Sequence, residues 1–306
     1  MSKLALIAGQ GDLPARLASV LGRAGRPWFA CHLDGFLPSG VGQSRGFRIE
    51  TLGTFLADLR TDGTTEVCFA GKIARPPLDP TAVDAQTMPL VPRMMQALQA
   101  GDDAALRIVI TFFEEAGIRV IGAHEVDHTL LEVPEVGTPS DQDVADIARA
   151  AAVHTALSAL DIGQALVVAR GQVLGIEALP GTDHMLACLA KGPPRPPQSA
   201  PSSGGLFGGD LFGGAADWLS GPGAGSGAAL PDFVRPKGGL LFKAAKAGQD
   251  LRIDMPAIGA ETVTRAAAAG LDGIVVERGA VLVLDGGDVA ARAEQKGLFL
   301  KTWTRP

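Results

Sequence analysis

A dense group of charged and amide side chains between Lys243 and Asp254 has the composition of a phosphate-binding site. The run Lys-Ala-Ala-Lys-Ala-Gly-Gln-Asp-Leu-Arg-Ile-Asp holds two lysines, one arginine, two aspartates and one glutamine. Lysine and arginine supply positive charge and hydrogen-bond donors for phosphate oxygens. Carboxylates supply the oxygen ligands that Mg²⁺ prefers. From the residue types alone, a solvated charged segment at the end of a strand fits about equally well.

The spacing of these residues resembles one protein family. From Lys243 to Thr262 the chain follows the pattern K-x-x-K-x-x-Q-D-x-R-x-D-x-P-x-I-G-x-x-T, which is similar to the signature of the UDP-2,3-diacylglucosamine pyrophosphatase family of the LpxI type. Five further blocks resemble family blocks, in the family order: 9–14, 70–76, 101–103, 160–164 and 181–183. The resemblance covers nearly the whole chain outside residues 192–236, so the chain is identified as a member of this family.

The resemblance implies an enzyme, a hydrolase acting on an acid anhydride. Its expected reaction is the hydrolysis of UDP-2,3-diacylglucosamine to UMP and 2,3-diacylglucosamine 1-phosphate (lipid X), in lipid A biosynthesis. Water is expected to attack the α-phosphorus, and Mg²⁺ or another divalent cation is the expected cofactor. Asp250 and Asp254 are the expected metal ligands. The full set of expected catalytic residues is Asp254, Asp250, Lys243, Lys246 and Arg252.

A glycine-containing loop near the N-terminus is a candidate part of the substrate site. Gly9, Gly11 and Asp12 lie between an apolar strand and a predicted helix, as nucleotide-binding loops do. Pro14 stands where a dinucleotide fingerprint has its third glycine, and proline lacks the N–H that a phosphate would use. We therefore interpret the loop as the floor of a nucleotide-sized pocket rather than as an NAD site, although a bare structural turn remains an alternative.

The other candidate substrate-binding residues come from loops and helix starts. Lys72 and Arg75 follow a predicted strand, and ligands of open α/β sheets bind beyond the carboxyl ends of strands. As often, such a pair only solvates a loop. The family blocks add candidates beside the pyrophosphate, and the amide of the signature can hydrogen-bond to phosphate oxygens or to the signature aspartates. These residues are Gln164, Thr182, Asp183 and Gln249.

Two other functions stay open at this level. One is a nucleotide-binding oxidoreductase on a Rossmann-like domain, and the missing third glycine argues against it. The other is a non-catalytic lipid- or nucleotide-binding module, which metal-dependent UMP release would exclude. The sequence contains no P-loop pattern, which argues against P-loop chemistry.

Composition and charge limit which cellular compartment and which partners we expect for this chain. The chain has 306 residues and a net charge of −6, which argues against general nucleic-acid binding. Its three cysteines lack C-x-x-C spacing, and Cys31 and Cys68 are expected to be buried in strands, as suits a reducing cytosol. No run reaches the ~18 apolar residues of a membrane span. We expect a cytoplasmic protein that meets its lipid-linked sugar nucleotide transiently at the surface of the inner membrane; a homodimer stays open.

Alternating apolar segments predict an α/β fold with two domains. Residues 1–130 are predicted to form an N-terminal Rossmann-like domain with a parallel sheet, because predicted strands alternate with predicted helices. The expected strands are 4–8, 28–33, 66–70 and 119–122. The expected helices are 13–23, 51–60, 88–100 and 103–116.

Residues 131–306 are predicted to form a C-terminal catalytic α/β domain with a mixed sheet. Two hairpins are expected, 164–170 with 172–178 and 274–277 with 280–284, each across an Arg-Gly turn. Their similar design suggests internal pseudo-symmetry, although any valine-rich hairpin needs a glycine turn. A Gly/Pro-rich stretch at 192–236 is predicted to be a disordered insertion that interrupts this domain.

Overall fold

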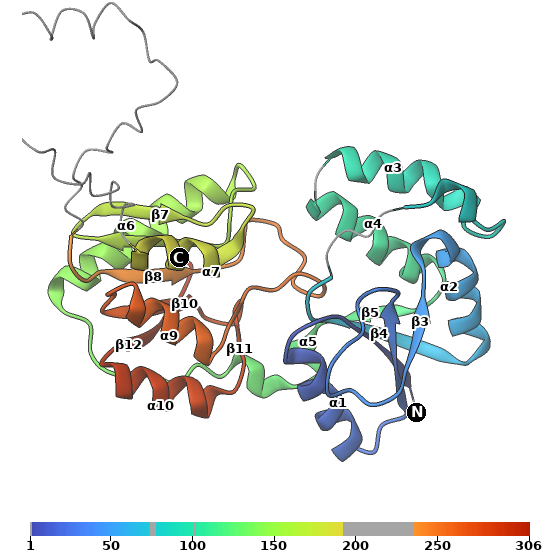
Figure 1. The fold of residues 1–306 in the computed structure, drawn as a ribbon, viewed down its shortest axis with the longest axis horizontal. Coiled ribbons are helices and arrows are strands. Elements are labelled where there is room, and N and C mark those ends of the chain that lie inside the picture. Colours follow the sequence, from blue (N-terminus) through green and yellow to red (C-terminus); the bar gives the residue numbers. More distant parts are fainter. Residues whose placement is uncertain (1, 74–77, 101, 192–235) are drawn as a thin grey trace, which may run out of the picture.

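Two five-stranded sheets organise the chain, one in each half (Figure 1). The computed structural model describes residues 2–73, 78–100, 102–191 and 236–306. Arg75 lies outside the described residues, as does the predicted insertion apart from its last residue. The predicted α/β class is confirmed, with a parallel sheet followed by a mixed one.

The N-terminal sheet is parallel throughout and has the strand order β3-β2-β1-β4-β5, an order typical of Rossmann-like folds. Its strands are β1 (Lys3–Ala8), β2 (Trp28–Leu33), β3 (Ser44–Phe47), β4 (Thr64–Ala70) and β5 (Arg119–Ile121). The sequence prediction lacks β3, because this short edge strand reads Ser-Arg-Gly-Phe and shows no apolar alternation.

Helices cover both faces of this sheet, and the period-2 alternation of β1 assigns residues to each face. Leu4 and Leu6 pack with α1, whereas Ala5 and Ile7 pack with α2 and α4. The helices of this half are α1 (Leu13–Arg23), α2 (Leu52–Thr61), α3 (Val91–Ala100), α4 (Asp102–Glu115) and α5 (Ala123–Val126). Short 3-10 turns lie at Ile49–Thr51, Pro80–Ala82, Met88–Leu90 and His128–Leu131.

The C-terminal sheet is mixed and has the strand order β12-β10-β8-β6-β7. The strands β8 (Leu240–Lys243), β10 (Gly273–Glu277) and β12 (Phe299–Trp303) run parallel to one another. The strand β6 (Ala165–Ala169) is antiparallel to β8, and β7 (Gln172–Ile176) is antiparallel to β6. The first predicted hairpin is therefore confirmed.

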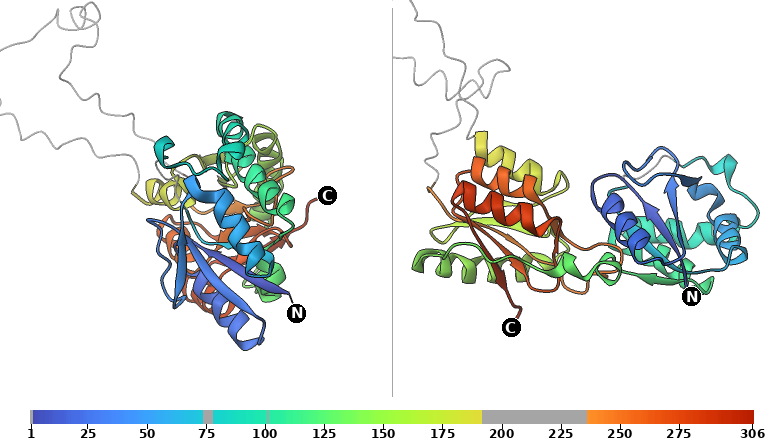
Figure 2. Two further views of the ribbon diagram at one scale, coloured as in Figure 1. Left: turned by 90° about the vertical axis from the view of Figure 1, so that its right-hand side faces the viewer. Right: turned by 90° about the horizontal axis from the view of Figure 1, so that it is seen from below.

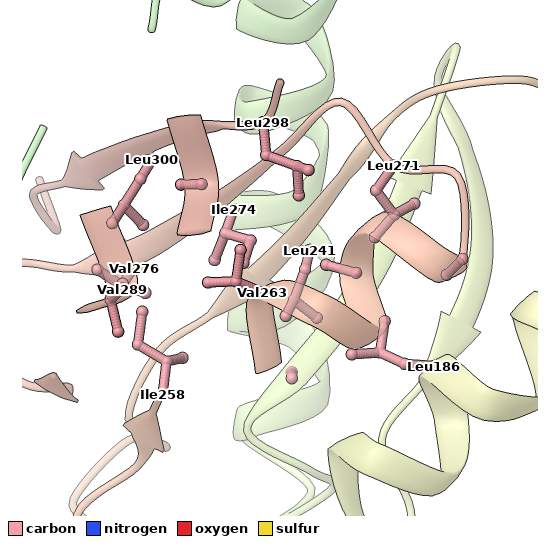
Figure 3. Packing of buried hydrophobic residues seen from close by; sticks show 14 of the residues in the cluster. Leu186, Leu241, Ile258, Val263, Leu271, Ile274, Val276, Val289, Leu298 and Leu300 are labelled. Atoms are coloured by element: carbon pink, nitrogen blue, oxygen red, sulfur yellow. The ribbon is translucent and has the colours of Figure 1, made fainter. Parts of the chain in front are cut away.

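Helices also cover both faces of the C-terminal sheet. The helix α6 (Asp141–Ser158) packs on one face, and α7 (Gly181–Lys191), α9 (Ala260–Ala268) and α10 (Gly286–Lys296) pack on the other. Figure 3 shows Val263 and Val289, from α9 and α10, directed at strand residues such as Ile274. This apolar packing fixes the strand ends that carry the candidate site.

The second predicted hairpin is wrong, and so is the pseudo-symmetry that it suggested. The strand β11 (Leu282–Val283) pairs in parallel with β9 (Ala257–Ile258) in a separate two-stranded sheet. A hairpin partner for β10 has no place, because β8 and β12 already occupy both edges of that strand.

The small β9–β11 sheet connects the two halves. Leu282 belongs to the apolar cluster under α1, and Met255 packs against the same cluster. The right-hand view of Figure 2 shows the two large sheets in separate lobes. The chain crosses between them near the predicted limit at 130 and 131, and that limit stays a prediction. In the described parts of the chain no helix is both long and apolar enough to traverse a bilayer.

Candidate functional site

Lys243 ends β8, and its side chain is buried in the C-terminal half, with an exposed fraction of 7%. Its ammonium group donates a hydrogen bond of 2.8 Å to the hydroxyl of Thr182, in the first turn of α7. The start of β6 lies beside the end of β8, since Ala165 is in register with Lys243. A strand end, a helix N-terminus and a neighbouring strand start therefore meet at this ammonium group, the usual ligand position in α/β sheets.

The charge of Lys243 is set by burial and by four nearby groups. Burial lowers the pKa of the ammonium group most strongly, and Glu177 and Asp183 oppose that shift. Lys72 lowers the pKa of Lys243 further, and Asp254 raises it. Lys72 comes from the loop after β4, so the structure brings a predicted residue of the N-terminal half to the signature of the C-terminal half.

Two amides hold the carboxylate of Asp254. Gln164, which precedes β6, donates to Asp254 Oδ2 over 3.3 Å, and Gln249 donates to the same oxygen. The amide oxygen of Gln249 in turn accepts a hydrogen bond of 2.9 Å from the backbone N–H of Lys246. Predicted residues of two blocks, Gln164 of 160–164 and Lys246 with Gln249 of the signature, thus form one connected group around Asp254.

Asp250 has a different environment from Asp254. Both of its carboxylate oxygens accept hydrogen bonds from the Arg252 guanidinium, at 2.9 and 2.6 Å. These bonds lower the pKa of Asp250 and raise that of Arg252. Arg252 also pairs with Glu114 of α4 at 2.6 Å. The pair therefore ties the signature loop to the N-terminal half, and the expected role of Arg252 at phosphate stays a prediction.

Several residues outside the predicted set hold the loop that follows β8. Glu277, at the end of β10, accepts from the backbone N–H of Ala245 at 3.0 Å and pairs with Arg305 at 2.7 Å. His154 bonds to the carbonyl oxygen of Ala244 over 3.2 Å. Sequence reasoning missed these contacts, because no local pattern links residues so distant in the chain.

Lys246 lies at the rim of this group. Its ammonium group pairs with Asp161 at 2.5 Å, and Asp161 is exposed. Nearby, Gly163 has φ +56°, and an added Cβ would stand 2.2 Å from the carbonyl oxygen of Glu177. Glycine is therefore required at 163 by close approach of the backbone, which explains part of the 160–164 block.

The predicted N-terminal loop pairs with the loop after β4. The backbones of Gln10 and Lys72 exchange two hydrogen bonds of 2.9 Å. A Cβ on Gly9 would stand 2.6 Å from the carbonyl oxygen of Lys72. Asp12 is exposed and precedes α1 without a side-chain capping bond. The expected roles of Gly9, Gly11 and Asp12 in substrate binding stay predictions.

Comparison with known proteins decides the family. The LpxI N-terminal domain model matches residues 3–130, and the LpxI C-terminal domain model matches residues 133–202 and 224–301. The chain belongs to the LpxI family. One relative, the UDP-2,3-diacylglucosamine pyrophosphatase LpxI of Caulobacter vibrioides, is 36% identical over 309 residues, which covers 98% of this chain and 97% of the relative. The resemblance inferred from six sequence blocks is thereby confirmed.

The carboxylates of this LpxI family member can be compared with the ligands that a divalent cation requires. The described part of the chain has no group of three or more His, Cys, Asp or Glu side chains arranged to hold a metal. Mg²⁺, however, commonly uses one or two carboxylates together with waters and substrate phosphates. Asp254, oriented by Gln164 and Gln249, fits that arrangement. Asp250 would have to exchange Arg252 for the cation.

Proposed function

We propose that this LpxI family member hydrolyses UDP-2,3-diacylglucosamine to UMP and 2,3-diacylglucosamine 1-phosphate, in lipid A biosynthesis. Membership in the family supports hydrolysis of a diphosphate bond by an enzyme. The structural observation that carries the proposal is the buried ammonium group of Lys243, whose 2.8 Å hydrogen bond goes to the neutral hydroxyl of Thr182. Burying a cation is costly unless anions are close. Glu177, Asp183 and Asp254 offset this cost only in part, because the pKa of Lys243 stays lowered, and a pyrophosphate supplies further negative charge.

Basic residues from both halves of the chain offset the negative charge of the pyrophosphate. Lys243 binds a phosphate oxygen from the C-terminal half, and Thr182 lies at the N-terminus of α7, where backbone N–H groups also favour anions. Lys72 approaches from the N-terminal half. Lys246 and Arg252 complete the expected clamp, each by leaving its present carboxylate, Asp161 or Asp250.

Asp254 orients the attacking water, and its own orientation is fixed by Gln249 and Gln164. A divalent cation, Mg²⁺ in our proposal, would be held by Asp254, with Asp250 as the second expected ligand. When bound, it offsets phosphate charge and stabilises the leaving phosphate. Because the substrate is lipid-linked, we also propose transient contact with the membrane surface.

Water attacks the α-phosphorus in this proposal, so that lipid X leaves with the bridging oxygen. In-line displacement requires the nucleophile opposite the leaving group. The experiment is turnover of UDP-2,3-diacylglucosamine in ¹⁸O-water with Mg²⁺, followed by mass spectrometry of both products. We expect the label in UMP, with lipid X unlabelled. Label in lipid X would show attack on the β-phosphorus.

The same assay tests the cation and the enzyme itself. EDTA should abolish UMP release, and excess Mg²⁺ should restore it. Activity that persists at the same rate in EDTA would contradict the proposed cofactor while leaving the hydrolase in place. No UMP release under any of these conditions, from a protein that unfolds cooperatively, would contradict the proposed reaction.

A further inference from the structure

An apolar groove lies between the edge strand β7 and the helix α7. It has a volume of about 360 Å³. The side chains that matter for its chemistry are Leu174, Ile176, Pro180, Met185, Cys188 and Leu189. No lysine, arginine, aspartate or glutamate is among the described residues that line it. Its polar side chains, His184 and Cys188, lie 3.4 Å apart and satisfy each other.

The groove lies next to the candidate phosphate site, at the start of α7. Gly181 lines the groove, and the next residue, Thr182, accepts the hydrogen bond from the buried Lys243. The lining residues Ala178 and Pro180 flank Leu179, which is 96% exposed. A ligand whose phosphate binds Lys243 can therefore extend an apolar part along β7 without leaving the protein surface.

We propose that this groove binds an acyl chain of the diacylated substrate. This inference rests on the proposed function. A nucleotide or a sugar in the groove would leave its polar groups facing apolar walls, which is unfavourable. An acyl chain has no such groups, and each methylene removed from water contributes favourably. The uncharged lining and the position beside Lys243 therefore select the lipid end of the substrate rather than its uridine end.

Gly175 helps to hold the walls of the groove in place. A Cβ added at Gly175 would stand 3.1 Å from Met185 Cγ and 3.4 Å from Leu189 Cδ1. Met185 and Leu189 also line the groove. A side chain at 175 would push these two residues away from β7, so glycine at this position preserves the shape of the groove.

The single exposed cysteine provides a direct test. Cys188 is exposed in the groove, whereas Cys31 and Cys68 are buried, and burial raises the pKa of each of those two thiols to about 12. N-ethylmaleimide should therefore modify Cys188 first. We expect lipid X, at a concentration that inhibits UMP release, to slow this labelling at least fivefold. UMP and glucosamine 1-phosphate should leave the labelling rate unchanged.

A matched control separates groove occupancy from general effects of lipid. Ala190 is exposed on the same helix and is not part of the groove. In a Cys188→Ala background, Ala190→Cys should be labelled equally fast with and without lipid X. Equal protection of both cysteines, or protection of neither at inhibiting lipid X concentrations, would overturn the proposal.

Substrate selectivity gives a second measurement that also distinguishes this proposal from the proposed function. Cys188→Trp should raise KM for the natural long-chain substrate at least fivefold and leave KM for a diacetyl analogue within twofold. Equal effects on both substrates, or on neither, would overturn the acyl-chain assignment while the enzyme remained a pyrophosphatase. If the unmodified protein releases no UMP from either substrate, the proposed function fails first.

Discussion

The two sheets contribute different chemical groups to the candidate site, mostly backbone from one and side chains from the other. Beyond β1 and β4, the N-terminal half supplies mostly backbone, because Gly9 and Gly71 allow the loops around Gln10 and Lys72 to pair, and Lys72 adds its positive charge near Lys243. Beyond β8, the C-terminal half supplies side chains, with Lys243 buried at the strand end. Both positions are carboxyl ends of parallel strands, where α/β folds bind ligands. Paired backbones dominate the first position, and a buried charged side chain dominates the second.

This difference predicts different responses to substitution. A change in the side-chain group should impair chemistry while the fold persists, because the group lies at the end of a strand that is already packed. A change in the glycine loops should impair folding or binding first, because an added Cβ meets a backbone atom. Four variants at three positions test that division, in order of decreasing expected effect.

Asp254→Asn should have the largest effect. We expect kcat to fall by about 10² or more, which corresponds to about 2.7 kcal/mol of transition-state stabilisation, with little change in melting temperature. Steady-state UMP release measures it. Asp161→Asn is the matched control, because Asp161 is an exposed carboxylate whose partner is Lys246, and such pairs contribute about 0–1 kcal/mol. Equal losses in both variants would contradict a special role for Asp254.

Lys243 should impose an alkaline limit on activity. Burial lowers the pKa of its ammonium group, and only the protonated form binds phosphate as a cation. We expect kcat/KM to fall as pH rises through that lowered pKa, below the value of about 10.4 for free lysine. Lys243→Arg should be less active, but its kcat/KM should no longer fall with rising pH, since arginine stays charged. An unchanged fall of kcat/KM at high pH in Lys243→Arg would show that another group causes it.

The same ionisation links stability to pH. Between the folded pKa and the unfolded pKa of about 10.4, the unfolded state binds more protons at Lys243, so the free energy of unfolding rises with pH. The cost of burying the charged ammonium is fully present below the folded pKa. Lys243→Met should lack this rise, which denaturant unfolding at several pH values measures. Parallel curves for both proteins would contradict the burial effect.

Gly71→Ala should have the smallest effect on chemistry. Gly71 has φ +89°, and an added Cβ would stand 2.6 Å from the carbonyl oxygen of Gln10. We expect a loss of about 1–3 kcal/mol in unfolding free energy and a few-fold higher KM with kcat retained. Gly63→Ala is the control, because Gly63 has φ +73° with nothing within 4 Å of the added Cβ. A larger loss in the control would contradict the close-approach argument.

The sequence by itself determined the local elements and the family. The helix at Leu13–Arg23 and the strand at Trp28–Leu33 are confirmed with the predicted bounds, because apolar periodicity and Pro14 are local signals. The hairpin of β6 and β7 follows from its Arg-Gly turn. The six signature blocks identified the family, since the order of motifs along a chain needs no knowledge of the fold.

Only the tertiary structure decided which residues meet. It placed Lys72 near Lys243, separated Asp250 from Asp254 by giving the former to Arg252, and gave β11 the partner β9. The two signature aspartates have different environments because distant partners differ: Gln164 bonds to Asp254 across 90 residues, and the Arg252 that holds Asp250 pairs with Glu114 across 138 residues. Periodicity and motif spacing encode the neighbours along the chain, whereas strand pairing and helix packing bring distant segments together, and those contacts set charge, burial and access at the site.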